Sequence, residues 1–426
     1  MTNSLIMPRR NFIKNVAVAG AALSALPLFN VRAQNAGRKF KVGLVGCGGR
    51  GNGALENMIE GAKTLGYEIE VYTVADHFPD RANAAAKKYN IPSDRVFIGP
   101  KGYQQLVTQP IEIVLLATPP AFRPVHLEAG LNAGKHMFIE KPVAVDPPGA
   151  RKVMELGDLA KQKGLSVVSG NQRRHQGSYL RNQYAIANGA IGKIVGGTVS
   201  WCGGALWYKE RESGQSDADY MIRNWVSFSE MSGDHIVEQH VHNLDVANWF
   251  IGRPPQSALG FGGRARRKTG NQFDFFSLDL NYGEDCHIHS MCRQVNGTDG
   301  GVSEFFHGTE GTAFGGGKIQ SDKLAQLKIP EFKTHDNPYV EEHIALLQSI
   351  VKGEPLNSAR SIAESTLTAI MGRIACYTGH LVRWSDLTTN EKSPWYNLKM
   401  APSAADFESG NVVAPKDGVC AIPGEA

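Results

Sequence analysis

Three glycines spaced as Gly-x-Gly-x-x-Gly are the first residues of this sequence whose types and spacing indicate chemistry. Gly46, Gly48 and Gly51 follow the apolar run 41–45, which predicts a buried strand, and they precede a helical pattern. In such a unit the glycines allow a tight turn and the close approach of a pyrophosphate, whose charge the helix N-terminus attracts. Asp76 ends the next apolar segment and supplies the acidic residue expected on the ribose. The stretch therefore predicts a dinucleotide-binding site.

The identity of the nucleotide depends on Asp76. A carboxylate at this position accepts hydrogen bonds from the ribose 2′- and 3′-hydroxyls and repels a 2′-phosphate. The sequence therefore favours NAD as the cofactor. Arg81 follows closely enough to receive a 2′-phosphate, so NADP stays open as the alternative.

Alternating strand and helix patterns continue to residue 170. The expected strands are 95–98, 111–118, 136–139 and 165–169, and the expected helices are 80–89, 126–133 and 148–163. Strands separated by helices of this length indicate a doubly wound parallel sheet, which binds ligands at the carboxyl ends of its strands. Thr118, Pro119 and Glu140 stand at such ends. We predict an α/β Rossmann domain that binds NAD over residues 38–170.

The pattern changes after residue 170, where strands dominate. The expected elements are strands 194–201, 275–282, 287–291 and 302–306 and helices 179–188, 338–351 and 361–378. We predict an α+β domain with an open, mostly antiparallel sheet over 171–390. It would bind the substrate and, through the uncovered face of its sheet, a second copy of the chain in a homo-oligomer. The tail over 391–426, rich in Pro, Ala, Ser and Gly, is expected to be an extended surface segment.

The first 33 residues have the features of an export signal. Arg9 and Arg10 open a twin-arginine signature, an apolar run covers 16–29, and Ala33 ends a cleavage site with small residues. The apolar run is shorter than the roughly 18–20 residues that span a bilayer, so no membrane association is expected after processing. We predict a mature periplasmic protein that begins near Gln34 and is exported already folded by the twin-arginine route.

Charge and cysteine content narrow the function classes. The formal net charge of +4 equals the four basic residues of segment 1–33, which contains no acid. The rest of the chain is neutral and gives no electrostatic reason to expect a nucleic-acid partner. The 6 cysteines include no Cys-x-x-Cys pair, so neither a zinc ribbon nor a redox pair is indicated.

Three short motifs resemble those of the glucose-fructose oxidoreductase and inositol dehydrogenase (Gfo/Idh/MocA) family. They are Ala-Thr-Pro-Pro at 117–120, Glu-Lys-Pro at 140–142 and His-Asn-Leu-Asp at 242–245, and the resemblance extends over essentially everything after residue 38. It implies a Rossmann domain, a second domain with an open sheet, and oxidation or reduction of a sugar or cyclitol hydroxyl with NAD or NADP. Some exported members hold the nucleotide through the whole catalytic cycle, and a minority use NAD to cleave glycosidic bonds.

The resemblance assigns the chemistry to Lys141, His242 and Glu238. Lys141 would lie beside the nicotinamide and hydrogen-bond the reacting hydroxyl. His242 matches the family's catalytic histidine, and removing a hydride from a carbinol requires such a base for the hydroxyl proton. Glu238 occupies the position of the usual Asp. Asp245 is expected to be structural or to orient His242.

The remaining predicted contacts fall into two sets. The residues expected to bind the nucleotide are Gly46, Gly48, Gly49, Arg50, Gly51, Asp76, Thr118, Pro119, His126, Glu140 and Lys141. The residues expected to contact the substrate are Arg173, Arg174, Trp225 and His240. For the two arginines, an ion pair across the domain interface is an equal alternative. Aromatic clusters such as that containing Trp225 are more often core than pocket.

One departure from the family pattern leaves a metal site open as an alternative. His240 replaces the usual Gly, and His235, Glu238 and His242 would share one face if the stretch formed a single helix. No remote fourth ligand is evident, so the sequence favours a site without metal.

The favoured function is an NAD-dependent oxidoreductase that acts on a hydroxyl of a small-molecule sugar, cyclitol or glycoside. Because the periplasm has no free NAD pool, the nucleotide is expected to be tightly held. A glycoside hydrolase or lyase with NAD as a catalytic redox cofactor is the alternative. An inactive nucleotide-holding binding protein is the alternative of another class, and retention of Lys141 and His242 argues against it.

Overall fold

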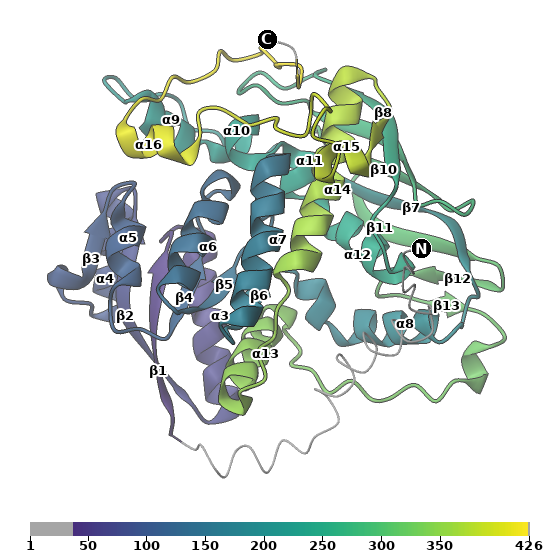
Figure 1. Cartoon of the computed structure of the whole chain (residues 1–426), viewed down its shortest axis with the longest axis horizontal. Helices are drawn as coiled ribbons and strands as arrows, with labels where there is room; N and C mark the ends of the chain where they lie inside the picture. The colour runs from purple at the N-terminus through teal and green to yellow at the C-terminus, as the bar shows by residue number, and fades with distance from the viewer. Residues whose placement is uncertain (1–36, 425–426) are drawn as a thin grey trace, which may run out of the picture.

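The computed structural model describes residues 37–424, which fold around two β-sheets (Figure 1). The export signal predicted for residues 1–33 lies outside the described residues. Within residues 37–424, no helix is both long and apolar enough to cross a membrane.

The first sheet consists of six parallel strands in the order β3-β2-β1-β4-β5-β6. They are β1 (Lys39–Val45), β2 (Glu68–Asp76), β3 (Val96–Ile98), β4 (Ile113–Leu116), β5 (His136–Ile139) and β6 (Val167–Ser169). The order changes direction between β1 and β4, and ligands of doubly wound sheets bind at such a switch point. The predicted Rossmann fold is confirmed. The glycine loop follows β1, and Thr118 and Glu140 follow β4 and β5 at the same edge.

Helices cover both faces of this sheet, whose central strand β4 is apolar and buried throughout. One face carries α3 (Gly49–Leu65), α4 (Pro79–Tyr89) and α13 (Pro338–Lys352), and the other carries α5 (Gly102–Val107), α6 (Arg123–Asn132) and α7 (Pro147–Gln162). Helix α13 comes from the far end of the chain. Its Ile344 packs on Gly61 of α3, where a Cβ atom would approach Ile344 to 3.2 Å. The Rossmann unit is therefore completed by a helix that begins well over 100 residues after its last strand.

The second sheet contains eight strands in the order β13-β12-β11-β7-β10-β9-β8-β14. They are β7 (Ile194–Gly203), β8 (Ser257–Gly263), β9 (Phe275–Asn281), β10 (His287–Gln294), β11 (Gly301–Gly308), β12 (Gly311–Phe314), β13 (Ile319–Gln320) and β14 (Val382–Arg383). Strand β10 runs parallel to β7, and the other pairs are antiparallel. The predicted mostly antiparallel sheet is confirmed.

One face of the second sheet is covered and the other is open. Its associated helices are α8 (Gly177–Ala187), α9 (Asp217–Arg223), α10 (Ser229–Ser232), α11 (His235–Glu238), α12 (Val241–Ile251) and α14 (Ala359–Thr378). Helices α12 and α14 form the core with the inward side chains of the strands. On the outward face, Leu259 and Phe261 are 49% and 67% exposed. Self-association through this face stays a prediction.

Strand β8 shows why some elements escape sequence patterns. Its sequence Ser-Ala-Leu-Gly-Phe-Gly-Gly has low strand propensity. Strand β9 packs so closely that a Cβ atom at Gly260 would lie 2.3 Å from Leu278 and one at Gly262 would lie 2.7 Å from Phe275. The glycines are needed for this close approach. Residues 257–263 form a strand because they pair with β9, and not because of their own propensity.

The C-terminal tail contains more structure than an extended segment. After α15 (Trp384–Thr388), the chain forms the short helix α16 (Ala404–Ser409), whose Phe407 is buried. Phe407 joins an apolar cluster with Phe122 of the first domain and Tyr220 of α9. Composition predicted the irregular backbone here but not this packing.

Substitutions at Gly49 and Gly51 of α3 test which of the two glycines the packing of the helix requires. A Cβ atom at position 51 would lie 1.8 Å from the Gly46 carbonyl oxygen, whereas one at position 49 meets nothing within 4 Å. Gly51→Ala should therefore lower the free energy of unfolding of the nucleotide-free protein by roughly 1–3 kcal/mol. Gly49→Ala should change it by less than about 0.5 kcal/mol. Urea unfolding followed by circular dichroism measures both, and equal effects of the two substitutions would contradict this assignment.

Candidate active site

A cavity of about 490 Å³ opens at the carboxyl edge of the first sheet. It lies against the glycine loop, the ends of β2 and β4, and segments of the second domain and the tail. Of the residues expected to bind the nucleotide, those that line it are Gly46, Gly48, Gly49, Arg50, Gly51, Asp76, Thr118, Pro119 and His126. Glu140 and Lys141 lie outside this lining.

The absence of a side chain has a different physical reason at each glycine of the loop. Gly46 has φ +95°, and a Cβ atom there would lie 2.8 Å from the Ala117 backbone. Gly51 allows α3 to pack against the loop. A Cβ atom at Gly48 would have one neighbour, Arg81 at 3.9 Å, and one at Gly49 would have none. The first and third glycines therefore serve the backbone, and the middle of the loop leaves open space for a ligand.

The open space is suited to a dinucleotide. Helix α3 has 17 residues, and its N-cap Gly48 makes no side-chain capping bond, so the first-turn N–H groups face the cavity without a cap. Such a helix terminus attracts phosphate. The fit supports a pyrophosphate above the loop.

Asp76 is held firmly at the end of β2. Its Oδ2 atom accepts a hydrogen bond from the Cys47 N–H at 2.7 Å, and its Oδ1 accepts one from the Phe78 N–H at 2.9 Å. Burial raises the pKa of Asp76 above its usual value, although these bonds and Arg81 oppose the shift. Arg81 and Arg223 also line the cavity. The site thus contains both the carboxylate expected for NAD and two cations near it.

His126 and Arg123 organise the segment that follows β4. The imidazole Nδ1 of His126 lies 3.2 Å from the Thr118 hydroxyl, and burial together with the neighbouring Arg123 lowers the pKa of His126 to about 3. Arg123 donates to the Thr118 carbonyl at 2.8 Å and to the Pro142 carbonyl. Arg123 thereby fixes the ends of two strands relative to each other, a role that sequence reasoning missed.

Arg50 and Glu140 form a pair at the base of the glycine loop. Arg50 Nε donates to Glu140 Oε1 at 2.5 Å, and the guanidinium lies 3.9 Å from Glu342 of α13. Burial and the adjacent Glu140 raise the pKa of Glu342 well above its usual range. Glu140 therefore acts on the loop through Arg50.

Lys141 joins the two domains. Its ammonium donates to Glu238 Oε1 at 2.9 Å and to the Glu238 backbone carbonyl at 2.6 Å. The two side chains are 16% and 13% exposed. Because an ammonium has three donors, two bonds to Glu238 leave one N–H for a further acceptor. Glu238 thus positions Lys141, a pairing that the sequence analysis did not predict.

His242 lies at the start of α12, with its imidazole stacked on the Trp201 ring at 5.8 Å between centroids. Burial lowers the pKa of His242 well below its usual value, and the positive charges of Lys141 and Arg173 lower it further. The ring is therefore neutral near pH 7. A neutral imidazole beside an ammonium can accept a proton from a bound hydroxyl.

The substrate contacts expected from the arginines have other partners in the structure. Both come from the segment that follows β6. Arg174 makes two bonds of 2.9 Å to Asp245, and Arg173 pairs with Glu304 of β11. Pairing across the interface, which the sequence left open, is the observed arrangement for both. Arg173 still lies 5.8 Å above the Trp201 ring, beside His242.

Trp225 and His240, both expected to contact the substrate, do not lie in one common pocket. Trp225 lines the nucleotide cavity with Trp207, their ring centroids 6.0 Å apart. His240 is fully buried, and its Nε2 atom lies 2.8 Å from the Ser290 hydroxyl. Burial and the nearby His235 lower the pKa of His240 to about 3. His240 therefore packs in the interior, where it connects the motif to Ser290 of β10.

The motif does not form the single helix that a metal site would need. Helix α11 ends at Glu238 and α12 begins at Val241, so the side chains of His235 and His242 do not share one face. His235 packs instead on Phe276, with ring centroids 5.0 Å apart. Within residues 37–424, no group of three or more His, Cys, Asp or Glu side chains could hold a metal ion.

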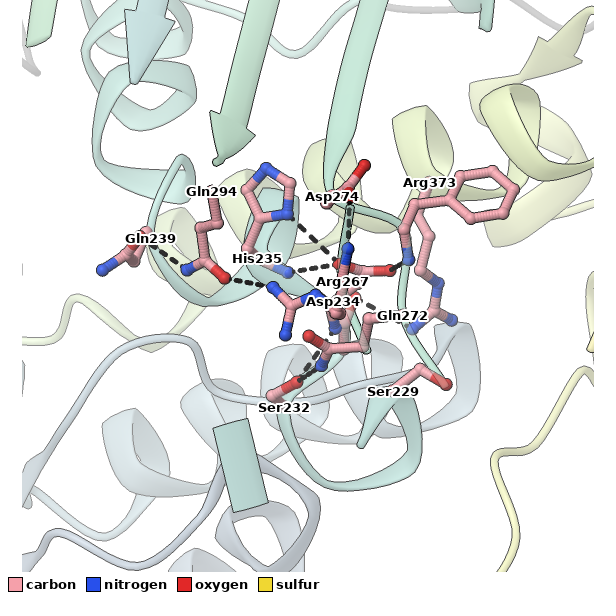
Figure 2. Close-up of polar contacts among 12 residues, drawn as sticks. Ser229, Ser232, Asp234, His235, Gln239, Arg267, Gln272, Asp274, Gln294 and Arg373 are labelled. Carbon is pink, nitrogen blue, oxygen red and sulfur yellow. Dashed lines mark hydrogen bonds and ion pairs between the residues drawn. The ribbon is translucent and has the colours of Figure 1, made fainter. Parts of the chain in front are cut away.

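A buried polar network holds this broken helix in place (Figure 2). Asp234 adopts φ +78°, and its carboxylate accepts from the His235 N–H at 2.6 Å and the Tyr377 hydroxyl at 2.6 Å. Gln294 donates to the Gln239 side chain at 2.9 Å and accepts from Arg267. Figure 2 shows Gln239, Gln294 and Arg267 joined by dashed contacts beside Asp234 and His235. The network fixes the backbone on both sides of Glu238.

Several cavity residues lacked a sequence signal. They are Tyr103, Phe122, Ile222, Arg223, Ala404, Phe407 and Glu408. The first two follow strand ends in the Rossmann unit and could have been found by the edge rule. The others come from the second domain and the tail, whose approach to this edge depends on tertiary structure.

Comparisons with known proteins agree with this arrangement. The model of an oxidoreductase family with an NAD-binding Rossmann fold, GFO_IDH_MocA, matches residues 40–171. The model of the GFO/IDH/MocA C-terminal domain matches residues 179–314. The chain belongs to the Gfo/Idh/MocA oxidoreductase family. It therefore has an NAD(P)-binding Rossmann fold.

The individual proteins that resemble this chain have low sequence identity to it. Inositol 2-dehydrogenase of Salmonella typhimurium is 32% identical over 218 residues, which are 50% of this chain and 54% of that protein. A scyllo-inositol 2-dehydrogenase (NADP(+)) of Bacillus subtilis is 25% identical over 236 residues, 52% of this chain and 60% of that protein. In the matched regions the chain spans from about a third to a little over half of the curated relatives' length.

A solved structure extends the likeness in fold. Apo scyllo-inositol dehydrogenase from Lactobacillus casei superposes with a TM-score of 0.63 over 81% of this chain and 98% of that chain. The sequence identity is 18%, so the likeness concerns the fold.

The charge environment of His242 gives a prediction that needs no substrate. Because the Arg173 cation disfavours protonation of the imidazole, Arg173→Gln should raise the pKa of His242 toward its usual value. The imidazole would then protonate at higher pH than in the unsubstituted protein. NMR titration of histidine-labelled protein measures this shift, with a His242→Asn spectrum to assign the signal. Lys193→Gln, which removes an exposed cation, is the control and should leave the pKa unchanged; an unchanged or lower value in Arg173→Gln would contradict the analysis.

Proposed function

We propose that this protein is an NAD-dependent oxidoreductase that oxidises or reduces a hydroxyl of a sugar, cyclitol or glycoside, with a tightly held nucleotide. The observation that carries the proposal is the juxtaposition of Lys141, held by Glu238, with a neutral buried His242. Lys141 follows β5 at the edge of the first sheet where the dinucleotide cavity opens, and His242 faces it from the start of α12 in the second domain.

The chain's own side chains account for the proton transfer. His242 takes the hydroxyl proton on its neutral imidazole in the oxidation direction and returns it in reduction. The free N–H of the Lys141 ammonium hydrogen-bonds the reacting oxygen and stabilises negative charge that develops on it. Glu238 keeps that ammonium in place. When bound, the nicotinamide supplies the acceptor or donor of the hydride.

The substrate class follows from the polarity of the surroundings and from the relatives. Lys141 and Arg173 offer N–H groups, and Trp201 offers an aromatic face of the kind that stacks on carbohydrate C–H surfaces. The similar curated proteins with named activities include inositol dehydrogenases. A polyhydroxylated ring is therefore the ligand that we propose.

The tight hold on the nucleotide is proposed from the sequence of residues 1–33. We propose that this segment exports the folded protein to the periplasm, where no free NAD pool would replace a lost cofactor. Chemistry that regenerates the nucleotide within the protein would follow. Either a second sugar restores the nucleotide, or one glycoside is oxidised, cleaved and reduced in turn.

One experiment tests the function. The protein purified from the periplasmic fraction should begin near Gln34 and contain bound nucleotide, identified by chromatography after acid release. Sugars, cyclitols and glycosides are then added without external NAD. Rising absorbance at 340 nm, abolished or lowered by about 10²–10⁴-fold in His242→Asn, supports the oxidoreductase.

Other outcomes have defined meanings. Release of free sugar without net reduction of the nucleotide would replace the proposal with redox-assisted glycoside cleavage. No response over a broad panel, with nucleotide bound, would leave a nucleotide-holding binding protein. His242→Asn must retain bound nucleotide, since His242 does not line the nucleotide cavity.

The choice of NAD over NADP is proposed from the buried carboxylate of Asp76. Asp76→Ser should improve NADPH binding relative to NADH by tenfold or more, because the repulsion of a 2′-phosphate is removed while Arg81 and Arg223 remain. Fluorescence titration of the nucleotide-free protein with NADH and NADPH measures the ratio. A native preference for NADPH would contradict the carboxylate argument.

A further inference from the structure

The C-terminal chain crosses the nucleotide site. Figure 1 shows the yellow C-terminal segment running from α15 across to α16, which lies beside α9 and above the helices of the Rossmann unit, and then over the top of the molecule to the C-terminus. We call residues 403–418 the strap. Three of its residues, Ala404, Phe407 and Glu408, line the same cavity as the glycine loop and Asp76.

The strap is attached to the Rossmann domain at the cavity wall. The Phe407 ring meets Phe122 edge to face, with centroids 5.1 Å apart, and Phe122 in turn stacks on His126. Glu408 accepts a hydrogen bond of 2.8 Å from the Tyr103 hydroxyl. Phe407 is only 3% exposed, so the strap fills this side of the cavity.

The far end of the strap is attached to the second domain. Asp217 of α9 accepts a hydrogen bond of 2.8 Å from the Ala414 N–H. Asp417 accepts one of 2.5 Å from the Gly270 N–H, and the Gly418 N–H donates to the Gly270 carbonyl at 2.8 Å. Just before the strap, the Met400 N–H donates to Asp146 of the Rossmann domain at 3.0 Å. The segment is thus fixed at both ends and to both domains.

We propose that the strap completes the nucleotide site and retains the bound nucleotide, with Phe407 packed against its adenosine half. The inference rests on the proposed function for the nucleotide alone. Asp76, the expected ribose partner, lines the cavity with Phe407, whereas Lys141 and His242 do not. A ligand in this cavity leaves only if the strap detaches or the ligand passes its aromatic wall.

The position of the strap allows nucleotide retention to be tested separately from the reaction. The contacts of the strap lie toward the ribose and base, away from the reacting hydroxyl. Loosening the strap should therefore speed nucleotide release without altering the side chains that transfer the proton. The proposal also gives a physical means for the tight hold that a periplasmic enzyme requires.

The test is the release rate of NADH from the full chain, with no sugar present. Protein loaded with NADH is mixed with excess NAD⁺, and the loss of bound-NADH fluorescence is followed. Phe407→Ala should release NADH at least tenfold faster than the unsubstituted protein. Asp417→Asn, which weakens a distant anchor without touching the cavity, should release it several-fold faster. Val419→Ala, at a 57% exposed position beyond the strap, is the control and should stay within twofold.

The results distinguish the proposals. Folded Phe407→Ala and Asp417→Asn proteins that both release NADH within twofold of the control would overturn the strap's role, as would an unsubstituted protein that binds no NADH. If Phe407→Ala does not fold, as judged by circular dichroism, the Asp417→Asn rate alone decides. Slow, strap-dependent release from a protein that transforms no carbohydrate would support the strap and contradict only the proposed reaction.

Discussion

The ion pair between Lys141 and Glu238 is the contact on which the site depends. It joins the edge of the first sheet to the broken helix of the second domain, at a place where both side chains are mostly buried. A buried charge without its partner is strongly unfavourable, so each residue fixes the position of the other. Arg174 with Asp245 repeats this arrangement nearby. The domain interface is therefore held by directional polar contacts and presents its remaining donors to one place.

The cations of this interface also oppose protonation of His242. Burial alone disfavours an imidazolium, and the cations of Lys141 and Arg173 add to the effect at His242. The backbone that carries these groups is held from behind by Asp234 and its network (Figure 2). In the function that we propose, nucleotide binding and proton transfer therefore use different parts of the structure, the cavity at the glycine loop and the interface beside it.

Sequence reasoning succeeded where chemistry follows from local order. The glycine loop, Asp76 and Thr118 were found because strands and helices have short repeats and because parallel strands bring their ends to one edge. It was less informative where a residue's partner comes from elsewhere in the chain. His240 was expected at the substrate but is buried against Ser290, and the arginines after β6 pair with carboxylates of the second domain. Strand β8, rich in glycine, exists because β9 packs closely against it.

The sequence by itself determined the Rossmann fold, the dinucleotide loop and the acidic residue that follows it, since each depends on neighbours along the chain. It also indicated, through the family motifs, the residues Lys141 and His242. Only the tertiary structure decided that Glu238 holds Lys141, that the motif breaks into two helices, and that the tail lies across the cavity. Those features depend on contacts between segments up to about 300 residues apart, as between Tyr103 and Glu408, and no local pattern encodes them.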